Sequence, residues 1–277
     1  LCIDVDAAST DALVRQASAV EPEWLPETSL RSATEVFFHP SQKGVVARQR
    51  VYFEDLLLSE SPTSLPETDE PAELLYAEGV RNWGQVFPAD DRKVGGFVAR
   101  VQSLAVWRPE LELPRFDEAE LHRVLRKLCE RRRTFADLRQ ADWLTALRGE
   151  LTWEQQQAVD REAPEQIAVP SGSRIRLTYE PPLIKDDGTV VARPPVLAVR
   201  IQEVFGLPET PRIAGGRVKV LLHLLAPNQR PQQVTDDLAS FWSNTYQTVR
   251  KELARRYPKH AWPEDPTTAV ATNRTKR

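Results

Sequence analysis

The sequence contains no methionine and only two cysteines, Cys2 and Cys129, among its 277 residues. Two cysteines are too few for a disulfide framework or a zinc site of their own, which favours a reducing, cytoplasmic location. No apolar run approaches the roughly 20 residues of a membrane-spanning helix. The longest candidate, 218–225, is interrupted by Lys219 and His223. We therefore expect a cytoplasmic protein with no membrane partner.

Motifs of nucleotide and metal chemistry are missing as well. The sequence has neither a Gly-x-x-x-x-Gly-Lys-Ser/Thr loop nor a Gly-x-Gly-x-x-Gly fingerprint. Its four histidines are scattered, and none lies at ligand spacing from a cysteine or a carboxylate. Ser171 and Ser173 lack the Gly-x-Ser-x-Gly setting of a catalytic serine. We expect no catalytic residue, metal or cofactor in this chain, and no ATP hydrolysis by it.

The beginning of the chain has neither a methionine nor a signal peptide. It opens with Leu-Cys-Ile-Asp-Val-Asp, whose alternation of apolar and polar residues predicts a strand at the first residue. A strand seldom begins without a lead-in. We expect the sequence to be a C-terminal piece of a longer protein whose chemistry lies on the other part.

Acidic residues are scarce only near the end of the chain. Residues 211–277 hold 12 Lys and Arg against 5 Asp and Glu, whereas the remainder holds 25 against 35. The formal net charge of −3 for the whole chain indicates nothing about nucleic acid. The asymmetry favours two alternatives equally: an anionic partner for the tail, or docking of the tail on the acidic body.

The apolar periodicity predicts an α+β fold. Within residues 1–60 we expect strands at 1–6, 35–39 and 44–53, a five-residue hairpin loop between the last two, and a helix over 10–17. Residues 59–71 are polar, acidic and rich in proline, without periodicity, and this predicts a linker, which we assign to 61–71.

Residues 72–165 are expected to form a helical block. Apolar steps of three and four predict a helix over 94–104, and Asp117 with Glu120 forms a capping signature before the next. Cys129 lies on the apolar stripe of that second helix. A third helix is expected over 135–147, and Thr152 with Gln155 caps a fourth.

Residues 166–277 are expected to form a C-terminal α+β domain. The patterns predict strands at 167–169, 175–179, 190–192 and 218–225, and a strand or short helix at 197–205. The last and strongest helix spans 235–256 and is closed by two arginines before Pro258. Its apolar stripe, which we expect to turn inward, includes Leu238, Trp242, Val249 and Leu253.

Two segments carry binding chemistry. In the strand 44–53, Val46, Arg48, Arg50 and Tyr52 share one face, typical of a solvated strand and also of phosphate contact beside base stacking. In the tail, cations interleave with Trp242, Tyr246, Tyr257 and Trp262. That pattern suits a polyanion with bases to stack on, and equally a helix whose aromatic residues pack inward.

The stretch Arg-Tyr-Pro-Lys-His-Ala-Trp-Pro-Glu-Asp-Pro at 256–266 closely resembles the C-terminal end of HrpB-type bacterial DEAH-box ATP-dependent helicases. Val-Pro-Ser-Gly-Ser-Arg at 169–174 and Gly-Leu-Pro-Glu-Thr-Pro-Arg-Ile-Ala-Gly-Gly-Arg at 206–217 resemble the same family. The likeness is strong over 150–266 and weak over 1–150. It implies that an N-terminal motor binds ATP and Mg²⁺, and that residues 1–60 are the remnant of an OB-like barrel.

The resulting hypothesis is an accessory region of an ATP-dependent RNA helicase that caps the motor and binds single-stranded RNA or DNA. Its partners would be the nucleic acid and the N-terminal helicase core of the same polypeptide. The alternative is a protein-interaction scaffold whose basic tail docks on its own acidic body. The candidate nucleic-acid-binding residues are Arg48, Arg50, Tyr52, Arg174, Arg250, Lys251, Arg255, Arg256 and Lys259.

Overall fold

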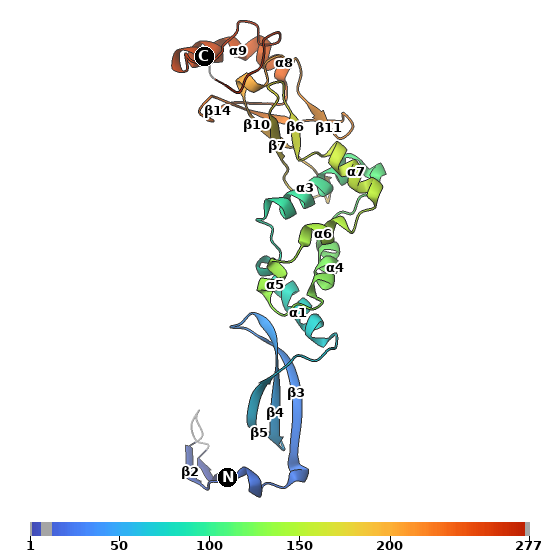
Figure 1. Ribbon diagram of the computed structural model, residues 1–277, viewed down its shortest axis with the longest axis vertical. Helices are drawn as coiled ribbons and strands as arrows, with labels where there is room; N and C mark the ends of the chain where they lie inside the picture. The colour runs from blue at the N-terminus through green and yellow to red at the C-terminus, as the bar shows by residue number, and fades with distance from the viewer. Residues whose placement is uncertain (1, 7–12, 275–277) are drawn as a thin grey trace. The chain divides into compact units, whose positions relative to one another are not determined.

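The computed structural model describes residues 2–6 and 13–274, with side chains from residue 18 onward except Pro22. Contacts divide the chain into two compact units (Figure 1). The first comprises Leu1–Val86 and Cys129–Gln140, and the second Phe87–Leu128 and Ala141–Arg277. The fold is α+β as expected, and the described strands form several small sheets without a closed barrel.

The first unit contains two antiparallel sheets. Strands β1 (Cys2–Asp6) and β2 (Leu13–Ala17) pair with each other. A second sheet has the order β3 (Leu30–His39), β4 (Gly44–Phe53) and β5 (Leu56–Thr63). The described residues of the unit also form three helices and two 3₁₀ turns: α1 (Glu70–Arg81), α2 (Trp83–Val86), α5 (Phe135–Arg139), η1 (Pro22–Trp24) and η2 (Glu27–Ser29).

The hairpin of β3 and β4 confirms the strands expected at 35–39 and 44–53, and its tip is joined to the segment before α5. Val45 N donates to the Arg133 carbonyl over 2.8 Å, and Phe135 N donates to the Lys43 carbonyl over 2.9 Å. A Cβ at Gly44 would lie 2.9 Å from a Thr134 methyl and 3.0 Å from the Arg133 carbonyl. Only glycine therefore permits this approach of two backbones.

Two expectations for the first unit are wrong. The segment expected to be a helix at 10–17 contains β2 from Leu13 on, and residues 7–12 lie outside the described part. Residues 59–63 of the expected linker belong to β5, and α1 begins at Glu70. The residues of β5 are exposed throughout, so they lack the apolar alternation that marks a half-buried strand.

The second unit begins with helices whose caps follow the sequence. It contains α3 (Arg92–Trp107), η3 (Pro109–Leu111), α6 (Trp143–Arg148), α7 (Trp153–Glu162) and most of α4 (Glu118–Cys129). Asp117 accepts from Glu120 N, and Thr152 with Gln155 forms a complete capping box. The single helix expected at 135–147 is instead α5 and α6, because Asp142 caps a new helix by accepting from Thr145 N.

A five-stranded sheet of order β14-β13-β10-β7-β6 follows. Its strands are β6 (Gln166–Ala168), β7 (Arg174–Thr178), β10 (Val196–Arg200), β13 (Leu221–Leu225) and β14 (Pro231–Thr235). Only β10 and β13 are parallel. The segment 197–205 is both strand and helix, since η4 (Ile201–Glu203) follows β10. Two short hairpins complete the unit: β8 (Leu183–Ile184) with β9 (Val190–Val191), and β11 (Arg212–Ile213) with β12 (Val218–Lys219).

The last helix is continuous but not uniform. After the Asp237 cap come α8 (Leu238–Ser240), a π-helical turn η5 (Phe241–Thr245) and α9 (Tyr246–Arg256). Trp242 and Tyr246, four residues apart on this helix, lie together in the core, with ring centroids 5.3 Å apart and edge to face. Leu238, Trp242 and Leu253 turn inward as expected, whereas Val249 is half-buried.

Arg100 joins the helices to the sheet inside the second unit. Its side chain is 3% exposed and comes from α3. The guanidinium donates to the carbonyls of Val159 and Ala163 and to the carboxylates of Asp160 and Glu165. A cation is thus buried at the C-terminus of α7, where unpaired carbonyls and the helix dipole favour it.

Replacing Arg100 by Ala should lower the free energy of unfolding by on the order of 3 kcal/mol, because the Ala163 carbonyl loses its donor and the packing of a buried side chain is lost. Urea denaturation of Arg100→Ala measures this. Arg123→Ala, on a 65% exposed side chain of α4, is the control and should stay within about 0.5 kcal/mol of the parent. Equal stability of the two variants would contradict a central role for Arg100.

Candidate nucleic-acid interface

Arg50 and Tyr52, two of the candidate residues on β4, are engaged within their own sheet. Arg50 contacts Glu35 of β3 over 2.7 Å and Glu60 of β5 over 3.1 Å. The Tyr52 hydroxyl donates to the other oxygen of Glu35 over 2.5 Å. The bond from Tyr52, helped by Arg50, lowers the pKa of the Glu35 carboxyl. Arg48 is half-buried and has no carboxylate partner among the described residues.

Arg250 is likewise bound inside the tail. Its Nε donates to the Trp262 carbonyl over 3.0 Å, and its guanidinium lies 3.4 Å from Glu264. This arginine therefore fastens the segment after the helix onto α9. The sequence did not predict such a role.

Most aromatic residues of the tail are core residues. Trp242, Tyr246 and Trp262 are buried, and each donates a hydrogen bond to a backbone carbonyl. They offer no ring face to a nucleobase. Tyr257 is half-buried and lies edge to face with His260. Burial, followed by the charge of Arg200, lowers the pKa of His260 below its usual value.

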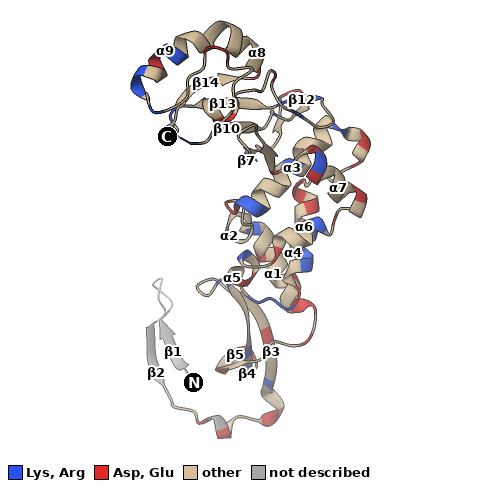
Figure 2. Ribbon diagram, turned by 45° about the horizontal axis from the view of Figure 1, so that its top comes forward, with Lys and Arg blue, Asp and Glu red and all other residues tan. Residues whose placement is uncertain are grey.

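Four candidate cations remain exposed around the end of α9: Lys251, Arg255, Arg256 and Lys259. Figure 2 shows the Lys and Arg positions along the ribbon of α9 in blue. None of them has a carboxylate partner among the residues that the structure describes. The Arg256 guanidinium lies 5.8 Å from the centroid of the Tyr257 ring. We call these four residues the tail cluster.

Arg174 is exposed on β7, opposite Ala168 of β6. It shares the second unit with the tail cluster, whereas Arg48, Arg50 and Tyr52 belong to the first unit. The candidate residues therefore fall into separate groups, on β4, on β7 and in the tail.

The serines of the stretch 169–174 hold a buried carboxylate. Glu203 is 4% exposed and accepts from the hydroxyl of Ser173 over 2.8 Å, from that of Ser171 over 3.3 Å and from Arg200 Nε over 3.0 Å. These hydrogen bonds satisfy a charge that could not otherwise be buried. The motif is thus a structural one.

The Gly-Gly-Arg end of the stretch 206–217 is structural too. Ala214 N donates to the Glu162 carbonyl, Arg108 pairs with the buried Glu162 carboxylate, and Arg217 pairs with Glu110 over 2.6 Å. The pKa of Glu110 falls to about 2, through a hydrogen bond from its own backbone, then through Arg108 and Arg217. Gly215 packs directly on Arg108.

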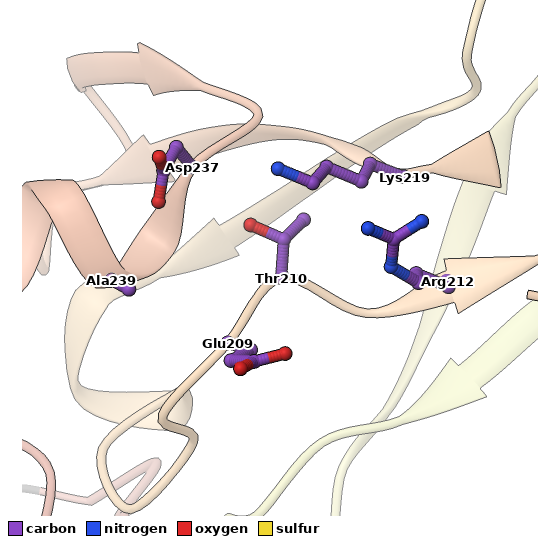
Figure 3. A pocket seen from close by; sticks show the side chains of 6 residues that line it. All are labelled: Glu209, Thr210, Arg212, Lys219, Asp237 and Ala239. Carbon is purple, nitrogen blue, oxygen red and sulfur yellow. The ribbon is translucent and has the colours of Figure 1, made fainter.

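A cavity of about 250 Å³ lies beside the β11–β12 hairpin (Figure 3). Its lining combines the cations Arg212 and Lys219 with the carboxylates of Glu209 and Asp237. Thr210, also on the lining, accepts a hydrogen bond from Leu238 N over 2.9 Å at the start of α8. With two charges of each sign, the cavity selects neither an anion nor a cation.

Two absences in the described part of the chain concern metals and membranes. No group of three or more His, Cys, Asp or Glu residues there could hold a metal ion. None of its helices combines the length and apolarity that crossing a bilayer requires.

Comparison with known proteins now defines the family. The family model "ATP-dependent helicase C-terminal" (HrpB_C) matches residues 124–266, just over half of the chain. The chain therefore belongs to the HrpB_C family of helicase C-terminal regions.

Individual relatives agree with this assignment and extend the likeness over residues 1–150. The ATP-dependent RNA helicase HrpB of Escherichia coli K12 is 36% identical over 98% of this chain. A crystal structure titled as the E. coli DExH-box NTPase HrpB covers 99% of this chain with a TM-score of 0.68. A second crystal structure, titled as the Escherichia coli DEAH/RHA helicase HrpB, covers 88% of this chain with a TM-score of 0.60. The sequence identity to each is 32%. The chain spans about a third of the length of each, 33%, 34% and 30%.

Gly215 and Gly216 offer a matched test of the Arg108 contact. Both have positive φ, +63° and +86°, but only at Gly215 would a Cβ meet Arg108, since nothing lies within 4 Å of one at Gly216. Each Ala variant should lose about 1–2 kcal/mol of stability from its backbone conformation. Gly215→Ala should lose about 2 kcal/mol more in urea denaturation, because Arg108 must leave Glu162. Equal losses would show that the contact contributes nothing.

Proposed function

We propose that this chain is the accessory C-terminal region of an ATP-dependent, DEAH-box RNA helicase of the cytoplasm. In this role it binds single-stranded RNA without reading its sequence, and it covers part of the motor. The observation that supports RNA binding is the tail cluster, four exposed cations without a carboxylate partner in the described part of the chain. The curated relative carries the name of an RNA helicase.

The tail cluster suits phosphate rather than base recognition. Arg and Lys on a helix surface neutralise phosphates and release counterions, a sequence-independent contribution to affinity. The buried indole and phenol rings beside them leave little for stacking. We therefore expect contacts with the RNA backbone that are similar for unrelated sequences.

Covering of the motor is supported by β5. Leu56, Leu57 and Leu58 follow one another on this edge strand and are 64%, 42% and 37% exposed. An edge strand with three exposed leucines needs a partner surface. We assign that surface to the N-terminal helicase core of the same polypeptide, where further strands would complete an OB-like barrel.

ATP and Mg²⁺ belong to that core in this proposal. The chain has no Gly-rich phosphate loop, and its described residues offer no carboxylate or histidine cluster for a divalent cation. In this proposal the chain contributes RNA binding and a surface that covers the motor, whereas the N-terminal core hydrolyses ATP.

The alternative, docking of the basic tail on the acidic body, is less well supported. In the described part of the chain, intramolecular ion pairs engage Arg217 and Arg250 of the region 211–277 but none of the tail cluster. A self-docked tail would place its most exposed cations against carboxylates.

Replacing Lys251, Arg255, Arg256 and Lys259 together by Ala should weaken RNA binding by roughly 100-fold at 0.15 M salt and lower the salt slope by roughly 3. Both expectations follow from a slope of about 0.7 per phosphate contact on a single strand. Filter binding of oligo(U) and of a mixed-sequence RNA at several salt concentrations measures the change.

Arg250→Ala is the control for this experiment, since its side chain is engaged by Trp262 and Glu264. It should lower the melting temperature with little change in the salt slope. The quadruple variant should melt as the parent does. If the quadruple variant bound RNA as tightly as the parent, the tail would be structural and the scaffold alternative would hold.

A further inference from the structure

The five strands of the C-terminal sheet differ from the rest of the chain in charge. Residues 166–168, 174–178, 196–200, 221–225 and 231–235 contain no Asp or Glu. They contain three arginines, Arg174, Arg176 and Arg200, and one histidine, His223. A sheet of a chain with 40 acidic residues thus carries basic groups alone.

The strand register places all four of these residues on one face. Gln166 lies opposite Arg176, Val196 opposite Thr178, and Ala198 opposite His223. Side chains alternate along a strand, so Arg174, Arg176 and Thr178 share the face of Val196, Ala198 and Arg200. His223 is in turn opposite Val234 of β14 and belongs to this face too. We call it the basic face.

The other face of the sheet is its core side. Leu177, Leu197, Val199, Leu222 and Leu224 point there, and all are buried. On the basic face, by contrast, Ala168, Arg174, Arg176, Thr178 and Ala198 are exposed and Val234 is 50% exposed. The basic face is therefore open in the middle of the sheet as well as at its edge.

The arginines of the basic face differ in how they are held. Arg174 and Arg176 have no carboxylate partner among the described residues. Arg200 is fixed by the buried Glu203, and it acts electrostatically on His260, which follows Lys259 of the tail cluster. Arg200 therefore lies at an end of the basic face that is near the tail segment.

We propose that the basic face binds the sugar-phosphate backbone of a single-stranded nucleic acid that passes over β7, β10 and β13. The proposal rests on the RNA-binding function above and adds a second binding surface to the tail cluster. Arg174 and Arg176 repeat at about 7 Å along their strand. That interval is close to the separation of successive phosphates in an extended single strand, and guanidinium groups pair with phosphate oxygens in a bidentate manner.

The composition of the face favours a polyanion over a protein partner. Protein interfaces depend on a few large buried anchors, mainly Trp, Tyr and Arg in apolar pockets. The basic face has no aromatic residue in its five strands except the imidazole of His223, and its one large apolar side chain that is well exposed is Val234. The small side chains of Ala168 and Ala198 leave room for a backbone to approach between the arginines.

Ala198 gives the sharpest test, because it is exposed in the middle of the face between Arg176 and His223. Ala198→Glu would place a carboxylate in the path of the phosphates, whereas Ala198→Gln has nearly the same size without the charge. In the 277-residue chain, Ala198→Glu should weaken oligo(U) binding at least tenfold, and Ala198→Gln should change it less than twofold. Equal effects of the two variants would overturn the proposal.

A second variant pair removes charge without adding bulk. Arg174→Ala with Arg176→Ala should weaken binding about tenfold at 0.15 M salt and lower the salt slope by about 1.4, the value for two phosphate contacts. Arg115→Ala with Arg123→Ala, on exposed arginines outside the sheet, is the control for net charge and should leave the slope nearly unchanged. Thermal melting checks that each variant folds.

The outcomes separate this proposal from the function on which it rests. If the tail-cluster variant loses RNA binding but the Arg174/Arg176 variant does not, the basic face fails and the RNA-binding function stands. If the parent chain binds no RNA at all, both fail. If polyglutamate of matched charge displaces oligo(U) equally well and binds as tightly, the basic face serves an acidic protein and the proposal is overturned.

Discussion

The buried guanidinium of Arg100 is the interaction on which the second unit depends. It donates hydrogen bonds to the carbonyls of Val159 and Ala163 at the end of α7. It also donates to the carboxylate of Glu165, the residue directly before β6. The chain leaves a helix and enters a sheet within four residues at this point, and the Ala163 carbonyl would lose its side-chain donor if Arg100 were absent. The helices and the sheet are joined here because one long cationic side chain donates hydrogen bonds to the end of α7 and to the residue before β6.

A buried charge paired with an opposite charge recurs beside two of the three stretches that resemble the helicase family, 169–174 and 206–217. Glu162 and Glu203 are buried carboxylates, 7% and 4% exposed, and each is paired with an arginine. The serines of 169–174 and the glycines of 206–217 supply hydroxyl groups or space around these pairs. The residues around these two glutamates thus hold the fold together, whereas the stretches at 169–174 and 256–266 also contain Arg174, Arg256 and Lys259, which are proposed to bind RNA.

The sequence predicted structural features that depend on neighbouring residues, and it did not predict features that depend on pairing between strands far apart in the chain. The hairpin of β3 and β4, the caps of α4 and α7 and the inward stripe of the last helix follow from neighbouring residues, and the structure contains them. The helix predicted over 10–17 is wrong where β2 begins at Leu13, because so short an apolar pattern fits both periods. The basic face was missed except for Arg174, since it joins strands up to 68 residues apart whose register no single stretch specifies. The alternation Arg-Ile-Arg at 174–176 was its only visible signal.

The insertion of the β3–β4 hairpin tip beside Arg133 and Phe135 has a consequence for synthesis on the ribosome. Gly44 and Thr134, paired in an isolated bridge, are separated by 90 residues of chain. At a translation rate of about 5–20 residues per second, the hairpin waits roughly 5–18 s for the segment that completes its unit. During this interval the exposed leucines of β5 and the unpaired hairpin tip are available to chaperones, and α3 is synthesised before the first unit can close.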